Sequence, residues 1–247
     1  MVTKAGQIIG PESFSPRQLP LRQLEKPRGD VVHLWHLDFN KLTNPLNPVE
    51  GARASDLSVV QQRTLRRFYL RLLLGAYLGM PGKDVHITRR IKGRPELDNA
   101  QSKDELDFSV ARSNGCYLVG ISSGAAIGVD LEIAARRAGK PLALAKRYFS
   151  EPETEALSVL GGDQLHRAFM HTWACNEAIV KASGVGIANQ LSRFSVDTNP
   201  ANPPTVMHML DDDHTAWRLA VARPVDDAIA AVAVRQGGIE LEGFSLS

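Results

Sequence analysis

The chain has 247 residues, of which 43% are hydrophobic and 23% are charged. These fractions are typical of folded globular proteins and exclude a disordered or a fibrous chain. The 29 basic and 27 acidic side chains nearly cancel, so the net charge gives no reason to expect nucleic acid or an anionic membrane as a partner. Any site for an anion must therefore be local.

Cysteine content and hydropathy indicate the compartment. The two cysteines, Cys116 and Cys175, cannot form a disulfide framework, and we expect both to be buried free thiols. No apolar run approaches the roughly 20 residues that a membrane span needs, and the first residues lack the apolar core of a signal peptide. We expect a cytoplasmic protein that contacts no membrane.

The first part of the chain predicts one long helix among strands. Residues 1–30 are rich in Pro, Gly and Arg without periodicity and predict an extended or partly ordered lead-in. A strand is expected at 31–37, and apolar residues at helical spacing predict a helix over 57–79 that ends at Gly79. Short strands separated by turns should follow at 85–88, 106–110, 117–121 and 127–132.

The second part repeats the order of helix and then strands. Two short helices are expected up to about residue 148 and after Pro152, and a long helix over 163–183 should end at Gly184. Further strands are expected at 205–209, 217–221 and 229–234. Short connections of the antiparallel type favour an α+β fold over a doubly wound sheet.

One predicted strand carries two carboxylates on the same face. Strict alternation in Ile127–Glu132 places Asp130 and Glu132 beside Gly128, opposite the apolar face. Carboxylates two residues apart start about 6.5–7 Å from each other, which is close enough to share a hard cation. We expect the glycine to let a bulky ligand approach. The alternative is an ordinary strand with a solvated polar face.

The long second helix carries a polar stripe. Trp173, Glu177 and Lys181 recur every four residues beside an apolar face. A surface pair of Glu177 and Lys181, with Trp173 in the core, would explain this pattern without any function. Neither segment alone decides between a structural and a functional role.

Together, the segments resemble the signature of Sfp-type 4′-phosphopantetheinyl transferases, which reads approximately (V/I)G(V/I)DxE, FFSxxE and WxxKEAxxKxxGxG. The corresponding parts of this chain are Ile127–Glu132, Tyr148–Glu153 and Trp173–Gly186. Upstream, Gly93–Leu97 is similar to the family's GKPxL and Phe108–Ser113 to its FNxSHS. Several motifs in the right order are far more specific than any one of them.

The resemblance implies two similar α+β halves related by pseudo-two-fold symmetry, each a small antiparallel sheet with a long helix. We divide the chain into the lead-in 1–30, an N-terminal half 31–123 and a C-terminal half 124–247 that carries the metal site. Such a two-half chain would work as a monomer.

The resemblance also implies an activity. The enzyme would transfer the 4′-phosphopantetheine arm of coenzyme A to a serine of an apo acyl or peptidyl carrier protein, and release adenosine 3′,5′-bisphosphate. Coenzyme A is then the co-substrate, and the cofactor is Mg²⁺, or Mn²⁺ in its place. The alternative is a weakened relative that binds coenzyme A or a carrier protein without efficient transfer.

Each matched residue acquires an implied role. The metal ligands would be Asp130, Glu132 and Glu177, since hard cations prefer carboxylate oxygens. Lys181 would hold the phosphates, and Glu177 or a metal-bound water would accept the serine proton. Contacts with coenzyme A are expected from Arg94, Arg112, Ser113, Lys181 and Arg63.

Three features leave alternatives open. Asn176 stands where the family usually has a lysine close to the phosphates, so transfer could be slower. Glu153, the last residue of the FFSxxE motif, either belongs to the site or sits in the first turn of a helix. The basic band on the first helix is either solvated or meets the 3′-phosphate of coenzyme A or an acidic carrier helix; its members are Arg63, Arg66, Arg67 and Arg71.

Overall fold

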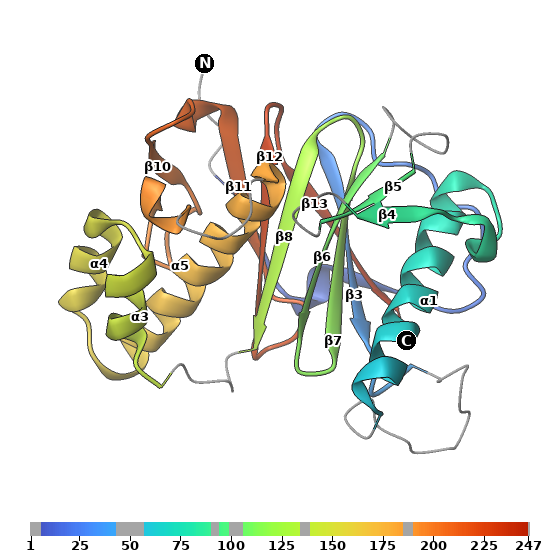
Figure 1. The fold of residues 1–247 in the computed structure, drawn as a ribbon, viewed down its shortest axis with the longest axis horizontal. Helices are drawn as coiled ribbons and strands as arrows, with labels where there is room; N and C mark the ends of the chain where they lie inside the picture. Colours follow the sequence, from blue (N-terminus) through green and yellow to red (C-terminus); the bar gives the residue numbers. More distant parts are fainter. Residues whose placement is uncertain are drawn as a thin grey trace.

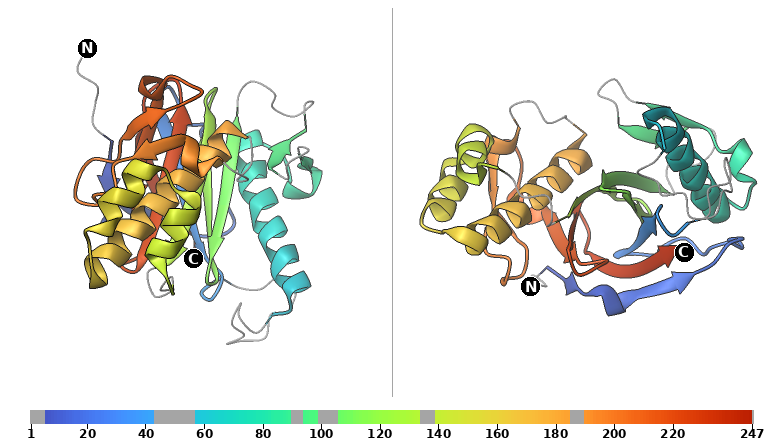
Figure 2. Two further views of the ribbon diagram at one scale, coloured as in Figure 1. Left: turned by 60° about the vertical axis from the view of Figure 1, so that its left-hand side comes forward. Right: turned by 90° about the horizontal axis from the view of Figure 1, so that it is seen from below.

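The computed structural model describes residues 6–42, 57–89, 94–98, 106–133, 139–184 and 190–246. Two β-sheets meet along one edge and curve around a shared apolar core, and helices lie on the outer side of each sheet (Figure 1). Figure 2 shows the same arrangement from two other directions, and its right-hand view shows the strands around the shared core. The fold is α+β, as the sequence predicted.

The first sheet is covered by helix α1 (Val59–Leu78). Its strand order is β2 (Phe14–Arg17), β13 (Glu240–Leu246), β3 (Val31–Asp38), β7 (Cys116–Ser122) and β6 (Asp107–Ser113). A capping box at Ser58 satisfies the first amides of α1, and Gly79 ends the helix in the left-handed conformation. Leucines and aromatic side chains of α1 pack on Trp35 and Phe108 of the sheet.

The second sheet is covered by one long helix, against which two short helices pack. Its strand order is β1 (Ile8–Ile9), β11 (Trp217–Ala222), β12 (Ala228–Arg235) and β8 (Ala126–Ile133). The helices are α3 (Pro141–Tyr148), α4 (Glu151–Ser158) and α5 (Gly162–Ser183). The long helix α5 lies directly on β8 and β12, and Gly184 ends it as predicted.

Small elements complete the described chain. Two short hairpin pairs are formed by β4 (Ile87–Arg89) with β5 (Pro95–Leu97), and by β9 (Phe194–Val196) with β10 (Val206–Met209). The 3-10 turns are Pro11–Ser13, Gly82–Asp84, Leu191–Arg193 and His214–Ala216. Among the described residues, we find no helix with the length and apolar character to cross a membrane.

The space between the two sheets is filled by small and branched apolar side chains. Leu34 and Leu118 from the first sheet meet Val129 and Val232 from the second, all fully buried. Burial of each such side chain stabilises the fold by about 1.5–3 kcal/mol. This layer brings strand β6 of one sheet against strand β8 of the other, and the candidate site lies near this junction.

The terminal segments differ most from the prediction. The expected lead-in contributes β1 to the second sheet and β2 to the first, both through parallel pairing. Strand β13 returns to the first sheet and pairs in parallel with β3, so both sheets are mixed rather than purely antiparallel. Strands from both sides of the expected division between residues 123 and 124 therefore lie in one sheet. The division into two halves stays a prediction.

Both cysteines are free thiols, as predicted. Cys175 is buried, whereas Cys116 is only partly buried. Burial raises the pKa of the Cys116 thiol to about 11, so this group is protonated and unreactive at neutral pH.

Candidate functional site

A pocket of about 760 Å³ opens between α1, the β4–β5 hairpin, strand β6 and the end of α5. We call it the arginine pocket, because its lining includes six cationic side chains: Arg63, Arg66, Arg67, Arg89, Arg112 and Lys181. Asp130 is the one carboxylate among the described lining residues. A concave site with this charge is suited to a ligand that carries several phosphates.

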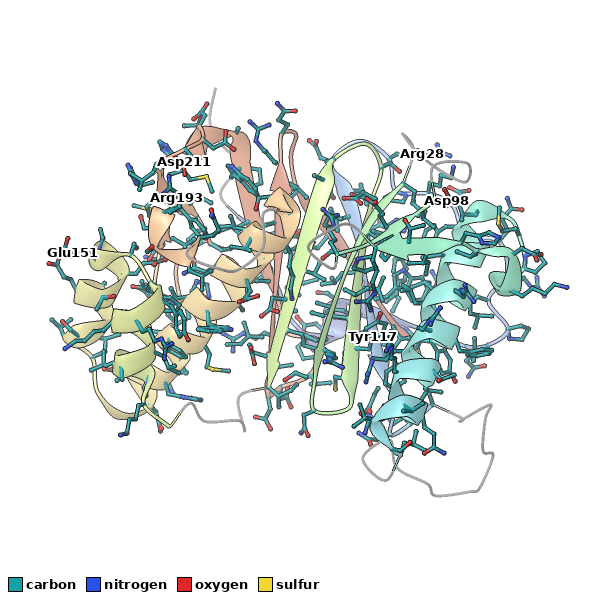
Figure 3. All side chains as sticks on the ribbon, viewed as in Figure 1. Arg28, Asp98, Tyr117, Glu151, Arg193 and Asp211 are labelled. Atoms are coloured by element: carbon teal, nitrogen blue, oxygen red, sulfur yellow. The ribbon has the colours of Figure 1, made fainter. Side chains whose placement is uncertain are left out.

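The arginines meet in the pocket because of helical and hairpin geometry. Arg63, Arg66 and Arg67 lie three or four positions apart and so share one face of α1. Arg112 lies opposite Tyr117 in the β6–β7 hairpin, and Tyr117 projects from the sheet toward α1 (Figure 3). Burial, and then the positive charge of Arg112, lowers the pKa of Arg66. Among the described lining residues, cationic side chains thus outnumber carboxylates, and a bound anion would relieve their mutual repulsion.

The floor of the pocket is an ion pair. Lys181 Nζ lies 2.6 Å from Asp130 Oδ1 and donates a second hydrogen bond to the carbonyl of Val129 at 3.1 Å. Asp130 is 7% exposed, and its Oδ2 has no hydrogen-bond partner among the described residues. A buried carboxylate oxygen without a partner is costly and indicates a position for a ligand atom or an ion.

Gly128 explains why helix α5 can bring Lys181 so close to Asp130. A Cβ atom at this position would lie 1.9 Å from the carbonyl oxygen of Ala178 and 2.4 Å from the amide nitrogen of Ala182. The helix backbone thus occupies the space beside the glycine. The expectation that Gly128 admits a bulky ligand was wrong: the glycine admits the helix.

Glu177 and Asp130 are close enough to repel each other. Burial, and after it the charge of Asp130, raises the pKa of Glu177 from an ordinary 4.5 to about 6, although Lys181 opposes this shift. Burial likewise raises the pKa of Asp130 against the effect of Lys181. Two carboxylates that resist ionisation at one place form a site that a cation would stabilise.

These residues fit a magnesium ion in part. Among the described residues, no three His, Cys, Asp or Glu side chains are arranged to hold a metal. Mg²⁺ commonly takes only one or two protein carboxylates and completes its octahedron with water and phosphate oxygens. Asp130 and Glu177 meet that requirement. Glu132 follows on the same face of β8 and is half-buried, so its role as a third ligand stays a prediction.

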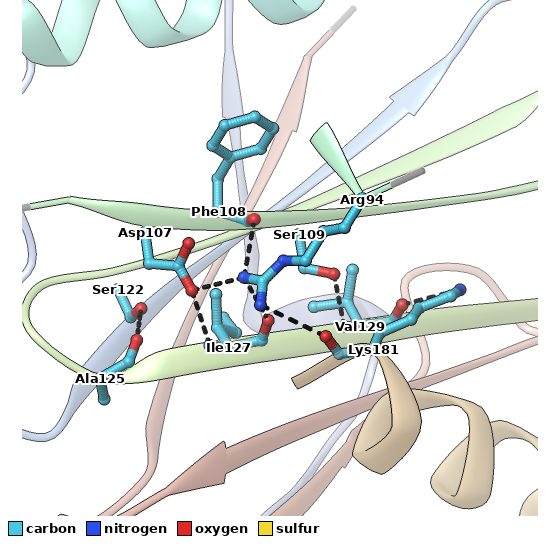
Figure 4. Close-up of polar contacts among 9 residues, drawn as sticks. All are labelled: Arg94, Asp107, Phe108, Ser109, Ser122, Ala125, Ile127, Val129 and Lys181. Atoms are coloured by element: carbon cyan, nitrogen blue, oxygen red, sulfur yellow. Dashed lines mark hydrogen bonds and ion pairs between the residues drawn. The ribbon is translucent and has the colours of Figure 1, made fainter. Parts of the chain in front are cut away.

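Arg94 does not line the described pocket. Its guanidinium is largely buried where β6, β8 and α5 meet, and it donates hydrogen bonds to one side chain and three backbone carbonyls (Figure 4). The predicted contact of Arg94 with coenzyme A has no support from this position. Ser113 is also buried, and its Oγ lacks a hydrogen-bond partner among the described residues, but it too lies outside the described lining.

Asn176 and Glu153 bind each other inside the protein. Asn176 is fully buried, and its Nδ2 donates a hydrogen bond to Glu153 Oε1 at 3.1 Å. The Glu153 carboxylate also accepts bonds from Ser150 and from the amide of Val196. Burial raises the pKa of Glu153 to about 7 against the effect of these bonds.

These contacts bear on the two expectations about Asn176 and Glu153. Asn176 faces the protein interior, so the loss of a phosphate-binding cation at this position does not follow. Glu153 completes the capping box of α4 and links α4, α5 and β9. Of the two alternatives for Glu153, these contacts match the residue in the first turn of a helix.

The sequence reasoning missed Arg89. It lies at the end of β4, and only the pairing of β4 with β5 brings it over the pocket. Gly93 and Gly186, two glycines of the matched motifs, lie outside the described residues.

Comparisons with known proteins identify the family. Residues 126–233, which include β8 and α5, match the family model of the 4′-phosphopantetheinyl transferase superfamily. The 4′-phosphopantetheinyl transferase HetI of Nostoc sp. is 32% identical over 215 residues, which cover 83% of this chain and 88% of HetI. The chain belongs to the 4′-phosphopantetheinyl transferase superfamily. The family predicted from the motifs is confirmed, and the chain is a transferase enzyme.

Other members of the superfamily are more distant. The 4′-phosphopantetheinyl transferase Sfp of Bacillus subtilis is 27% identical over 172 residues, which cover 63% of this chain and 73% of Sfp. Among solved structures, a holo-(acyl-carrier-protein) synthase from Bacillus anthracis in complex with coenzyme A matches with a TM-score of 0.37 and 21% identity. That match covers 46% of this chain and 97% of the synthase.

Proposed function

We propose that this phosphopantetheinyl transferase moves the phosphopantetheine arm of coenzyme A to a serine hydroxyl of an apo acyl or peptidyl carrier protein. The reaction depends on Mg²⁺, which Mn²⁺ can replace, and releases adenosine 3′,5′-bisphosphate. The observation that carries this proposal is the arginine pocket with the Asp130–Lys181 pair at its floor. Coenzyme A bears a pyrophosphate and a 3′-phosphate, which are the kind of ligand that six cationic side chains favour.

The pocket binds and orients the anionic part of coenzyme A. Arg63, Arg66 and Arg112 carry permanent charge and can fork onto phosphate oxygens. Anchoring of the nucleotide by these arginines leaves the pyrophosphate at the floor, beside Lys181. The chemistry of phosphoryl transfer then relies mostly on positioning and on neutralising the charge that develops.

Asp130 and Glu177 would hold the magnesium ion, which supplies charge neutralisation at the pyrophosphate. Lys181 adds a positive charge to the same place and orients Asp130 through Oδ1. Glu177 is the candidate general base for the serine proton. Its pKa is about 6 without metal, and a bound cation would lower it, so a metal-bound water is the other candidate to accept this proton.

Asn176 was one of the features that supported the alternative of binding without efficient transfer. Since this side chain is bonded to Glu153 in the interior, its identity supports neither a slower nor a faster reaction. The presence of Asp130, Glu177 and Lys181 at one place supports transfer. We also propose that the enzyme acts as a monomer in the cytoplasm.

A direct transfer assay tests the proposal. The protein is incubated with coenzyme A, Mg²⁺ and an apo carrier protein, and the carrier is weighed by mass spectrometry. We expect the carrier to gain the mass of one phosphopantetheine arm, and the gain to disappear when a chelator removes the metal. Absence of any gain across acyl and peptidyl carriers would refute the transferase function and leave binding as the alternative.

A further inference from the structure

Strand β8 is the edge strand of its sheet, yet its outer side lies inside the molecule against β6. An edge strand presents backbone N–H and C=O groups that no neighbouring strand pairs. When such groups are buried they need other partners, because each unsatisfied group is costly. At two residues of this outer edge of β8 the partners are side chains.

Ile127 and Val129 have both their N–H and their C=O groups bonded in this way (Figure 4). The amide of Ile127 donates to Asp107 Oδ2 at 3.0 Å, and the amide of Val129 donates to Ser109 Oγ at 3.0 Å. The carbonyl of Ile127 accepts from Arg94 Nη2 at 3.0 Å, and that of Val129 accepts from Lys181 Nζ at 3.1 Å. Side chains thus replace a strand along this edge.

Arg94 is the centre of this arrangement. Its Nη2 lies 2.5 Å from Asp107 Oδ2 and also donates to the carbonyl of Phe108 at 3.3 Å. Its Nη1 donates to the carbonyl of Lys181 at 3.3 Å. The Arg94 side chain is 13% exposed, so these bonds form away from bulk water. One planar guanidinium therefore joins β6, β8 and α5, which a lysine ammonium at the same place has no geometry to do.

These hydrogen bonds fix the strand and the helix that carry Asp130 and Lys181, the ion pair at the pocket floor. Asp130 directly follows Val129, whose amide is fixed by Ser109. Lys181 is held twice, by its own Nζ on β8 and by its carbonyl on Arg94. A shift of about 1 Å in catalytic groups can cost about 100-fold in rate.

We propose that Arg94, Asp107 and Ser109 form an inter-sheet junction that positions Asp130 and Lys181 for transfer, and that Arg94 is a positioning residue rather than a contact of coenzyme A. The inference rests on the proposed function, because its kinetic consequence is read in transfer. Its structural part, the side-chain pairing of β8, can be measured without activity.

Kinetics separate the two roles of Arg94. In the variant Arg94→Lys, which keeps the charge, we expect kcat to fall at least about tenfold while the KM for coenzyme A changes less than about twofold. The control is Arg112→Lys, an exposed arginine of the pocket lining, where we expect a raised KM and a nearly unchanged kcat. An Arg94→Lys variant with a raised KM and an intact kcat would overturn the proposal, since that result marks a ligand contact.

Hydrogen exchange tests the junction independently of transfer. Peptides that contain Ile127 and Val129 should exchange faster in Arg94→Lys and in the milder variant Ser109→Ala, while peptides of β12 keep the wild-type rate. If β8 exchange stays at the wild-type rate in both variants, the junction does not hold the strand and the proposal fails. If β8 exchange rises but the wild-type protein modifies no carrier, the function is refuted and the junction is supported.

The variant Ser109→Ala keeps the exchange experiment informative if Arg94→Lys fails to fold. It removes one acceptor, that of the Val129 amide, and leaves the Arg94–Asp107 pair in place. Circular dichroism of both variants confirms that the fold is retained before exchange is read. A folded Ser109→Ala protein with faster β8 exchange supports the junction even if Arg94→Lys is unstable.

Discussion

Replacement of Glu177 by glutamine should make the metal-free enzyme more stable and inactive. Glu177 is 6% exposed, and burial together with Asp130 raises its pKa from 4.5 to about 6. A shift of about 1.5 pKa units corresponds to about 2 kcal/mol of folding free energy lost when the group ionises. Glutamine keeps the shape and removes this charge.

The pH dependence has a definite sign. The folded protein holds its proton on Glu177 more tightly than the unfolded chain does, so the stability of the wild type falls as the pH rises from about 4.5 to 6. The advantage of Glu177→Gln should therefore be up to about 2 kcal/mol at pH 8 and should shrink toward pH 4.5. The exposed residue Glu155 on α4 offers the control variant Glu155→Gln, for which we expect no change.

Urea unfolding with a chelator, at both pH values, measures the difference. Added Mg²⁺ should then stabilise the wild type and not the variant, because a ligand that binds the folded state alone shifts unfolding. Transfer activity should be lost in Glu177→Gln. A variant less stable than the wild type at pH 8 without metal would refute the reasoning, since Glu177 would then not be a strained, ionised carboxylate.

Three further predictions concern the pocket and its support. Arg112→Ala should raise the KM for coenzyme A about tenfold, the loss of about 1.4 kcal/mol of binding, as measured by steady-state transfer; an unchanged KM would place the phosphates elsewhere. Gly128→Ala should destabilise the fold by about 3 kcal/mol, because the new Cβ meets the backbone of α5, and a wild-type urea midpoint would contradict this packing. Asn176→Lys should lower stability and leave the rate per folded enzyme unimproved, since it buries an ammonium beside Glu153; faster transfer would show that the side chain reaches the phosphates.

Local patterns predicted the elements that frame the site. Helical spacing and the glycine stop signals predicted α1 over 57–79, and the structure has Val59–Leu78. Strict alternation predicted β8, and the i,i+4 stripe predicted the helix that carries Glu177 and Lys181. These features depend on neighbours in the sequence, which is why they were accessible.

The parts that could not be predicted depend on contacts between distant segments. Strands β1, β2 and β13 acquire their structure from parallel partners far along the chain. The role of Arg94 follows from three backbone carbonyls on β6, β8 and α5, and a motif says nothing of these. The orientation of Asn176 could have been predicted from the sequence, however, because the residue before Glu177 points about 100° away from it around the helix.

The position of β13 within its sheet has a consequence for how the protein is made. Residues 240–246 lie between β2 and β3, so β2 has no neighbour in that sheet until these residues, more than 200 positions downstream, have been synthesised. During translation the first sheet therefore stays incomplete, with an unpaired edge on β3, while the following part of the chain is synthesised and folds. Chaperone binding to that edge, or removal of residues 240–246, would therefore separate β2 from β3 and leave the whole first sheet incomplete.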